Sequence, residues 1–210
     1  ALPIYAYLEP TGDAVSATLL QSASEAAPYL TYLAPFSFEM QRDGTLKEPP
    51  LNGIAEIAAA SQATLMMVIT NLEEGAFSDE LGNIVLNDMA IQDRLLNEII
   101  DTAHRYGFRG IQFDLEFLLP EDREATALAP KTSAEQAGQW YEAHDYGAHG
   151  EIVDFVVLMT YEWGYSGGPP MPVSPIGPVR EVVNYALTEI PASKIMLGQN
   201  MYGYDWTLPF

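Results

Sequence analysis

The chain has 210 residues, of which 48% are hydrophobic, and its 29 acidic and 9 basic side chains give a net charge of −20. This length and apolar content can bury a sizeable core, so we expect a single domain over residues 1–210. The negative charge would repel phosphate backbones and anionic membrane surfaces, and we expect neither a nucleic-acid nor a membrane partner. Because the sequence has no cysteine, disulfides and thiolate metal sites are excluded, and the redox compartment stays open.

The sequence shows no membrane or export segment. Its longest apolar runs are interrupted and fall well short of the roughly 20 residues that span a bilayer. The first ten residues, ALPIYAYLEP, lack the basic and apolar regions of a signal peptide. They also lack a starting Met, which is typical of a processed or trimmed end.

Short apolar runs alternate with amphipathic or Ala-rich stretches along the chain. Seven runs have the composition of buried strands, at residues 3–8, 32–38, 64–70, 110–117, 126–129, 153–161 and 194–199. Apolar residues at helical spacing predict helices at 54–60, 89–106 and 179–187, with Asn87 or Asp88 as the N-cap of the second. Such alternation is typical of βα units around a parallel sheet.

The alternation fits either a (β/α)8 barrel or an open doubly wound sheet. Polar and aromatic residues gather where the runs end, at Glu39, Asn71, Asp114, Glu116, 161–163 and 200–204. A barrel places its active site at this carboxyl rim, so the distribution favours the barrel.

Two features depart from a complete barrel. Only about eight residues separate the fourth and fifth runs, whereas a parallel crossover needs about 10–12 or more. No eighth run follows the seventh. We therefore expect that the fourth crossover helix and the eighth strand are missing, and that the sequence omits a stretch after Ala125 and another after Phe210.

The most informative segment is GIQFDLE, in which Gln112, Asp114 and Glu116 alternate and so share one face of a strand. In a barrel that face is the interior, where two carboxyl groups repel each other and lose water. Both effects raise a pKa and make a carboxyl group a proton donor near neutral pH. The alternative is an edge strand with a solvent-exposed polar face.

The segment YGFRGIQFDLEF resembles the fourth-strand signature of glycoside hydrolase family 18. Arg109 and Gln112 stand where that signature has acidic residues, while Asp114 and Glu116 match it. The resemblance implies a (β/α)8 TIM barrel in which Glu116 protonates the glycosidic oxygen and Asp114 orients the 2-acetamido group of the substrate. The acetamido oxygen would then be the nucleophile. Gln112 cannot take up charge as an acid would, although its amide can still hydrogen-bond Asp114, and we expect Gln112 to be a substrate-binding residue.

Two later blocks extend the resemblance over nearly the whole chain. The first, IVDFVVLMTYEWGYSGGPPMPVSP, is similar to the sixth strand of the family. It implies that Tyr161 holds the acetamido carbonyl and that Met159 lines the floor of the site. Glu162 replaces an aspartate, and we expect it to contact the substrate directly. Trp163 is a candidate stacking surface for a sugar ring, and ordinary packing is the alternative.

The second block, KIMLGQNMYGYDWTLPF, is similar to the seventh strand. It makes Asn200 a candidate hydrogen-bonding partner of a sugar, and Tyr202, Tyr204 and Trp206 candidate stacking surfaces. The segment PEDRE at 120–124 and the wording of the two blocks resemble the spore-cortex-lytic N-acetylglucosaminidase subgroup of the family.

The histidines do not suggest a metal site. His104 falls in a predicted helix, His144 and His149 fall in a connecting segment, and their spacing matches no metal-binding motif. We expect neither a metal nor a cofactor.

From these observations we expect a retaining hydrolase of β-1,4 bonds after N-acetylglucosamine in peptidoglycan, acting in the spore or at the cell wall. A hydrolase of chitin oligosaccharides and a non-catalytic, lectin-like sugar-binding protein are the alternatives. Lectin-like members usually lose the terminal glutamate, which is retained here as Glu116. The sequence does not set the oligomeric state.

Overall fold

The computed structural model describes residues 3–118, 129–138, 141–142 and 144–207. Contacts along the chain divide it into two compact units, Ala1–Phe117 and Leu118–Phe210, and each unit is described by itself. The expectation of a single domain over residues 1–210 stays a prediction.

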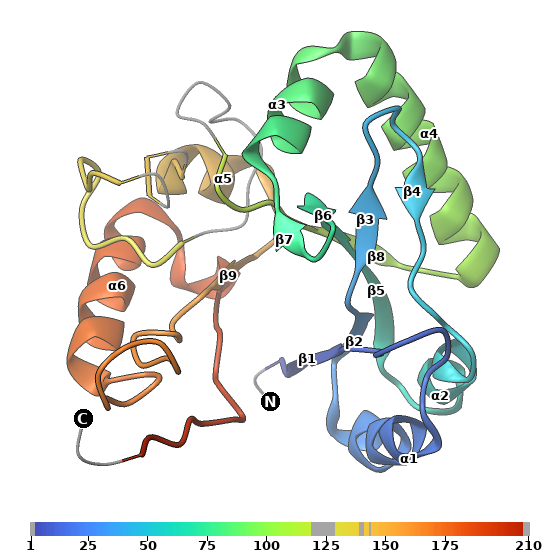
Figure 1. Ribbon diagram of the computed structural model, residues 1–210, viewed down its shortest axis with the longest axis horizontal. Helices are drawn as coiled ribbons and strands as arrows, with labels where there is room; N and C mark the ends of the chain where they lie inside the picture. The colour runs from blue at the N-terminus through green and yellow to red at the C-terminus, as the bar shows by residue number, and fades with distance from the viewer. Residues whose placement is uncertain (1–2, 119–128, 139–140, 143, 208–210) are drawn as a thin grey trace. The chain divides into compact units, whose positions relative to one another are not determined.

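The first unit is built on a six-stranded sheet, shown in blue to green in Figure 1. Its central strand β5 (Thr64–Thr70) is buried from its second residue onward and pairs in parallel with three strands. These are β2 (Tyr32–Pro35), β3 (Phe38–Met40) and β8 (Gly110–Asp114). The sheet is completed by β1 (Tyr5–Leu8), which is parallel to β2, and β4 (Leu46–Lys47), which forms a hairpin with β3.

The sequence predicted most of these strands, with shorter bounds in the structure. The run 64–70 is confirmed in full, and the run 32–38 forms two strands, β2 and β3, which pair with successive parts of β5. The run 110–117 ends as a strand at Asp114, so the prediction that Glu116 lies within the strand is wrong. The hairpins β3–β4 and β6–β7 (Leu72–Glu73 and Ala76–Phe77) were not predicted, because their strands are too short to show a pattern.

Two predicted helices of the first unit are confirmed, α2 (Ile54–Ala60) and α4 (Met89–Tyr106). The Asp88 carboxylate caps α4 by accepting from the N–H groups of Ala90 and Ile91 at 2.8 and 3.1 Å. Gly107, at φ 76°, ends the helix in the left-handed conformation. Helices α1 (Ala17–Ala26) and α3 (Asp79–Asn87) were not predicted, although their serine N-caps, Ser16 and Ser78, are visible in the sequence.

The second unit contains α5 (Tyr146–Ile152), β9 (Val156–Leu158), α6 (Ile176–Glu189) and β10 (Ile195–Leu197). The strands β9 and β10 pair in parallel, and β9 packs on α6 through Val156, Leu158, Val182 and Ala186. The predicted runs 153–161 and 194–199 are confirmed as shorter strands, and the helix predicted at 179–187 is longer.

Three further predictions concern this unit. The run 126–129 lies outside the described residues except for Ala129, which has no regular structure. His149 lies in α5 and not in a connecting segment. In the described residues that follow β10, up to Thr207, no further strand forms.

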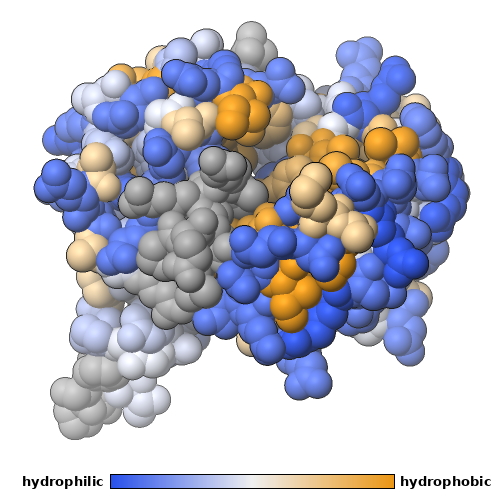
Figure 2. All heavy atoms as spheres, turned by 90° about the horizontal axis from the view of Figure 1, so that it is seen from above, coloured by the Kyte–Doolittle hydropathy of each residue, from blue (hydrophilic) through white to orange (hydrophobic). Residues whose placement is uncertain are grey.

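The surface reflects the composition. Figure 2 shows a face on which hydrophilic residues predominate and apolar residues form small groups. Within the described part of the chain, no helix is long and apolar enough to cross a membrane.

Candidate active site

The carboxyl end of β8 carries the two acids that the sequence analysis selected. Along β8, Gln112 and Asp114 face the covered side of the sheet, while Ile111 and Phe113 are 42% and 41% exposed. Asp114 is buried, so the alternative of a solvent-exposed polar face does not hold. Glu116 follows two residues later and is half-buried.

Burial away from water is the main cause of the raised pKa of both acids. Burial raises the pKa of Asp114 to about 6. Burial, and then the charge of Asp114, raise the pKa of Glu116 to about 7. Both carboxyl groups therefore keep a proton to a higher pH than exposed acids do, and a negative charge on Asp114 makes the ionisation of Glu116 more costly. A buried pair of this kind can supply a proton donor near neutral pH.

Two tyrosines of β1, Tyr5 and Tyr7, lie near Asp114. The Tyr7 hydroxyl lies 3.1 Å from Oε1 and 2.7 Å from Nε2 of Gln112, so it can donate to the one or accept from the other. The described hydrogen bonds of the Gln112 amide thus go to Tyr7 and not to Asp114. Burial raises the pKa of Tyr5 and of Tyr7, and the Asp114 charge raises both further. Both hydroxyls stay protonated at neutral pH.

Tyr5 and Tyr7 were not predicted as site residues, although the run at 3–8 contains both. A tyrosine in an apolar run is an ordinary core residue, and only the pairing of β1 with β2 brings these rings toward β8. Ser37 and Thr70 were also not predicted as site residues. Both are buried, and their hydroxyl oxygens lie 2.8 Å apart. Thr70 is the residue of β5 that pairs with Asp114 of β8.

In the second unit, the predicted residues Met159, Tyr161 and Glu162 follow the end of β9. The Thr160 hydroxyl donates to the Gly198 carbonyl at 2.7 Å, and the Gly198 N–H donates to the Leu158 carbonyl at 2.8 Å. A side chain at Gly198 would place its Cβ 2.6 Å from the Tyr161 ring. Glycine is therefore required for Tyr161 to pack against the end of β10.

Glu162 is bound by two tyrosines of the segment that follows β10. Its carboxylate accepts from the hydroxyl of Tyr202, and from that of Tyr204 at 2.9 Å. Burial raises the pKa of Tyr202, while the hydrogen bond with Glu162 is the main cause of the raised pKa of Tyr204. Glu162 has φ 65°, a conformation that is rare outside glycine and that turns its side chain toward these rings.

Two other predicted binding residues have structural partners in this unit. Trp163 packs against the core of α6 and β9, which favours the packing alternative for its ring. Asn200 accepts from the Ser174 hydroxyl and donates to the Tyr202 carbonyl, both at 2.7 Å, and so shapes the segment that carries Tyr202. Tyr202 is 47% exposed, which leaves part of its ring accessible to a ligand.

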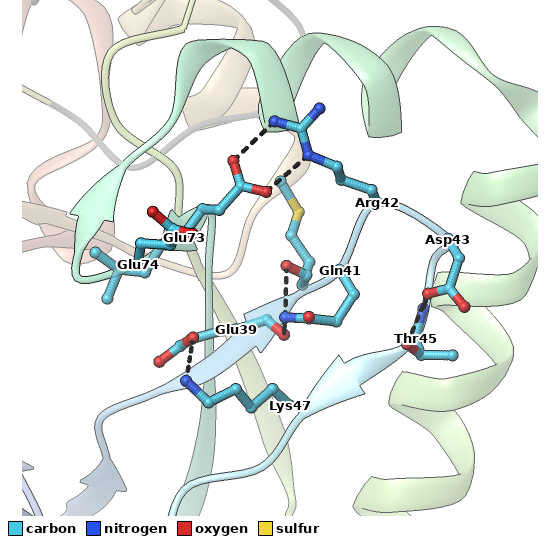
Figure 3. A pocket seen from close by; sticks show the side chains of 10 residues that line it. Glu39, Gln41, Arg42, Asp43, Thr45, Lys47, Glu73 and Glu74 are labelled. Carbon is cyan, nitrogen blue, oxygen red and sulfur yellow. Dashed lines mark hydrogen bonds and ion pairs between the residues drawn. The ribbon is translucent and has the colours of Figure 1, made fainter.

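A cavity of about 640 Å³ opens between the β3–β4 and β6–β7 hairpins of the first unit (Figure 3). Several of its charged groups form ion pairs: Arg42 binds Glu73 of the cavity and Glu80 outside it, and Lys47 pairs with Glu39 at 2.8 Å. The two hairpins are thereby held together beside the carboxyl end of β5. In the described part of the chain, no group of three His, Asp or Glu side chains could hold a metal ion.

The family model described as "Glycosyl hydrolases family 18" matches residues 7–209, nearly the whole chain, including Asp114 and Glu116. The chain belongs to this family.

Two relatives show how closely it matches particular members. A cortical fragment-lytic enzyme of Bacillus subtilis is 64% identical, over 98% of this chain and 52% of its own length. A cortical fragment-lytic enzyme of Bacillus anthracis is 49% identical, over 100% of this chain and 54% of its own length. The chain thus spans about half the length of these relatives.

Solved structures give the fold. The spore cortex-lytic enzyme SleL of Bacillus cereus matches with a TM-score of 0.96 at 50% identity, over 99% of this chain and 53% of that one. A chitinase of Chromobacterium violaceum matches with a TM-score of 0.86 at 19% identity, over 98% of this chain and 70% of that one, a likeness that concerns the fold alone. The fold is the α/β TIM-barrel type of the family, as predicted.

The lengths of the alignments bear on the prediction that the sequence omits an internal stretch, which we call the gap. The alignment with the Bacillus anthracis enzyme runs over 230 positions, while this chain has 210 residues, so at least 20 aligned positions have no residue here. Those relatives therefore contain internal residues without a counterpart in this chain. The location of the gap after Ala125 stays a prediction.

Proposed function

We propose that this protein hydrolyses β-1,4 bonds after N-acetylglucosamine in spore-cortex peptidoglycan, with retention of configuration. Membership in the family and the 64% identity with a cortical fragment-lytic enzyme support this substrate and an action in the spore. The observation that carries the proposal is the acid pair at the end of β8, where Asp114 is buried, Glu116 is half-buried two residues later, and burial raises the pKa of both groups.

The proposed reaction uses the acetamido group of the substrate itself. Glu116 donates its proton to the glycosidic oxygen, and the acetamido oxygen attacks the anomeric carbon as the bond to the leaving sugar breaks. Asp114 accepts a hydrogen bond from the acetamido N–H and stabilises the positive charge of the cyclic oxazolinium ion. Glu116, now a carboxylate, takes a proton from the water that opens this ring. Retention follows from the two successive displacements.

The family resemblance also implies residues that hold the substrate. We assign Tyr161 to the acetamido carbonyl and Met159 to the floor of the site, as the family resemblance implies. Tyr202 would offer its exposed ring to a sugar. Glu162 and Asn200 would then act through the tyrosine-bearing segment that they fix, which is a revision of direct sugar contact for these two residues.

The test is the replacement Glu116→Gln, assayed on cortex fragments with the disaccharide products resolved by mass. The amide keeps the shape of the side chain but cannot donate the proton, so turnover should fall by about 10²–10⁴-fold while glycan binding is kept. Glu56→Gln, on the exposed face of α2, is the matched control and should retain the wild-type rate. Wild-type turnover in Glu116→Gln would overturn the assignment.

Substrate variation tests the mechanism in the same assay. A thiazoline analogue of N-acetylglucosamine should inhibit, and substrates without the acetamido group should not be cleaved, because the nucleophile would be absent. A sugar covalently bound to Asp114, trapped and found by mass spectrometry, would refute the substrate-assisted route even if Glu116 proved essential.

A further inference from the structure

Asn71 lies at the point where the ladder between β5 and β8 ends. The last pair of that ladder is Thr70 with Asp114, and Asn71 is the next residue of the chain after β5. Its side chain is fully buried. Beyond the last strand pair, its amide makes the hydrogen bonds to the Glu116 backbone that a β5 peptide group would otherwise make. Oδ1 accepts from the Glu116 N–H at 2.9 Å, and Nδ2 donates to the Glu116 carbonyl at 2.8 Å.

This contact matters because Glu116 lies beyond the strand. The residue that follows it, Phe117, has φ 57°, a left-handed conformation that costs a non-glycine residue free energy. A peptide segment in this geometry does not continue the strand. The primary amide of Asn71 has one donor side and one acceptor side, as a backbone peptide has, and so it pairs with both polar groups of Glu116.

The amide is itself held from the other side. Nδ2 also donates to the Ser78 carbonyl at 2.9 Å, and the Ser78 N–H donates to the Asn71 carbonyl at 3.0 Å. These bonds close the β6–β7 hairpin, which Arg42 ties to the β3–β4 hairpin through Glu73. The Asn71 side chain is therefore fixed between two parts of the first unit.

We propose that Asn71 is a positioning residue, which holds the Glu116 backbone so that its carboxyl group stays at the glycosidic oxygen. This inference rests on the proposed function of Glu116 as proton donor. Aspartate is the most informative substitution, because it keeps the size of the side chain and one acceptor. It cannot donate to the Glu116 and Ser78 carbonyls, and it places a third carboxyl group beside Asp114 and Glu116.

The test compares Asn71→Asp and Asn71→Ala with the wild-type protein by kcat, KM and the pH profile of kcat. A displacement of about 1 Å at a reacting group can cost about 10²-fold, so kcat should fall by about 10–10³-fold with KM changed less than about threefold. The basic limb of the profile, which reports Glu116, should shift, because the surroundings of its carboxyl group change. Asp88→Ala destabilises the same unit away from Glu116 and should alter neither kcat nor the profile.

A double variant separates this inference from the proposed function. In the Glu116→Gln background, Asn71→Ala should cause no further loss of turnover if Asn71 acts through Glu116, whereas a general structural effect would add to it. Full turnover in Glu116→Gln would refute the proposed function, and full kcat with an unshifted profile in both Asn71 variants would refute the inference.

If neither Asn71 variant folds, hydrogen exchange of the wild-type protein tests whether the Glu116 backbone is held. The backbone amide of Glu116 should exchange as slowly as the amides of β8. Exchange at the rate of an open loop would refute the proposal that Asn71 holds the Glu116 backbone.

Discussion

At the scale of single residues, burial decides the chemistry of the β8 acids more than their mutual repulsion does. Burial is the first cause of the raised pKa of both groups, and at Glu116 the charge of Asp114 adds to it. The spacing DxE therefore places two carboxyl groups with raised pKa values at the end of one strand. The sequence indicated this pair, but not that the neutral Gln112 would turn to Tyr7.

The contact between Tyr7 and Gln112 gives the prediction at this scale. Tyr7→Phe leaves the Gln112 amide without its described partner and should lower the free energy of unfolding by about 0.5–1.5 kcal/mol, the usual net value of one hydrogen bond. Urea unfolding at pH 7 measures the difference. Tyr29→Phe, an exposed position at 76%, is the control and should change nothing measurable. Equal losses in both variants would contradict the assigned bond.

At the scale of elements, capping explains which helices could be predicted. The helix α4 combines an apolar face, an aspartate cap and a terminal glycine, and its predicted bounds agree with the structure. The helix α3 has Ser78 as its cap and two acids in its first turn, but it ends at the residue before the Asp88 cap of α4. Because α3 and α4 are separated by Asp88 alone, the sequence pattern indicated one helix start at this place, and α4 was predicted without α3.

The Asp88 cap gives the prediction at this scale. Asp88→Ala removes the acceptor for two N–H groups at the start of α4 and should lower the free energy of unfolding by about 1 kcal/mol. Asp88→Asn and Asp88→Ser, which can still accept, should recover most of this loss. Thermal or urea unfolding of the three variants is the measurement, and an alanine variant as stable as the asparagine variant would show that the cap does not stabilise α4.

At the scale of the whole molecule, the raised pKa values link stability to pH. Asp114 and Glu116 hold their protons in the folded state up to about pH 6 and 7, whereas in the unfolded chain they lose them near pH 4. The folded state therefore binds more protons between these limits. The contribution of the pair to stability is fully present below about pH 4 and is lost as the pH rises through 7.

Glu116→Gln removes one of the two titrating groups and so isolates its share of this dependence. At pH 4 the variant should match the wild-type protein, and at pH 8 it should be more stable by about 1–3 kcal/mol, since no buried carboxylate has to form. Urea unfolding of both proteins from pH 4 to 8 gives the difference, from which the effect of the net charge of −20 cancels to first order. A constant difference over this range would contradict the raised pKa of Glu116.

The sequence by itself determined the alternation of strands and helices, the acids Asp114 and Glu116 and the family to which they belong, because periodicity, caps and a short motif are local properties. The tertiary structure decided how the site is held. Asn71 lies 45 residues from Glu116 and Tyr7 lies 105 residues from Gln112 along the chain, and an asparagine or a tyrosine at a strand end is common. Only the parallel pairing of β1, β2, β5 and β8 brings these side chains together, since pairing between distant strands leaves no mark in the residues of either strand alone.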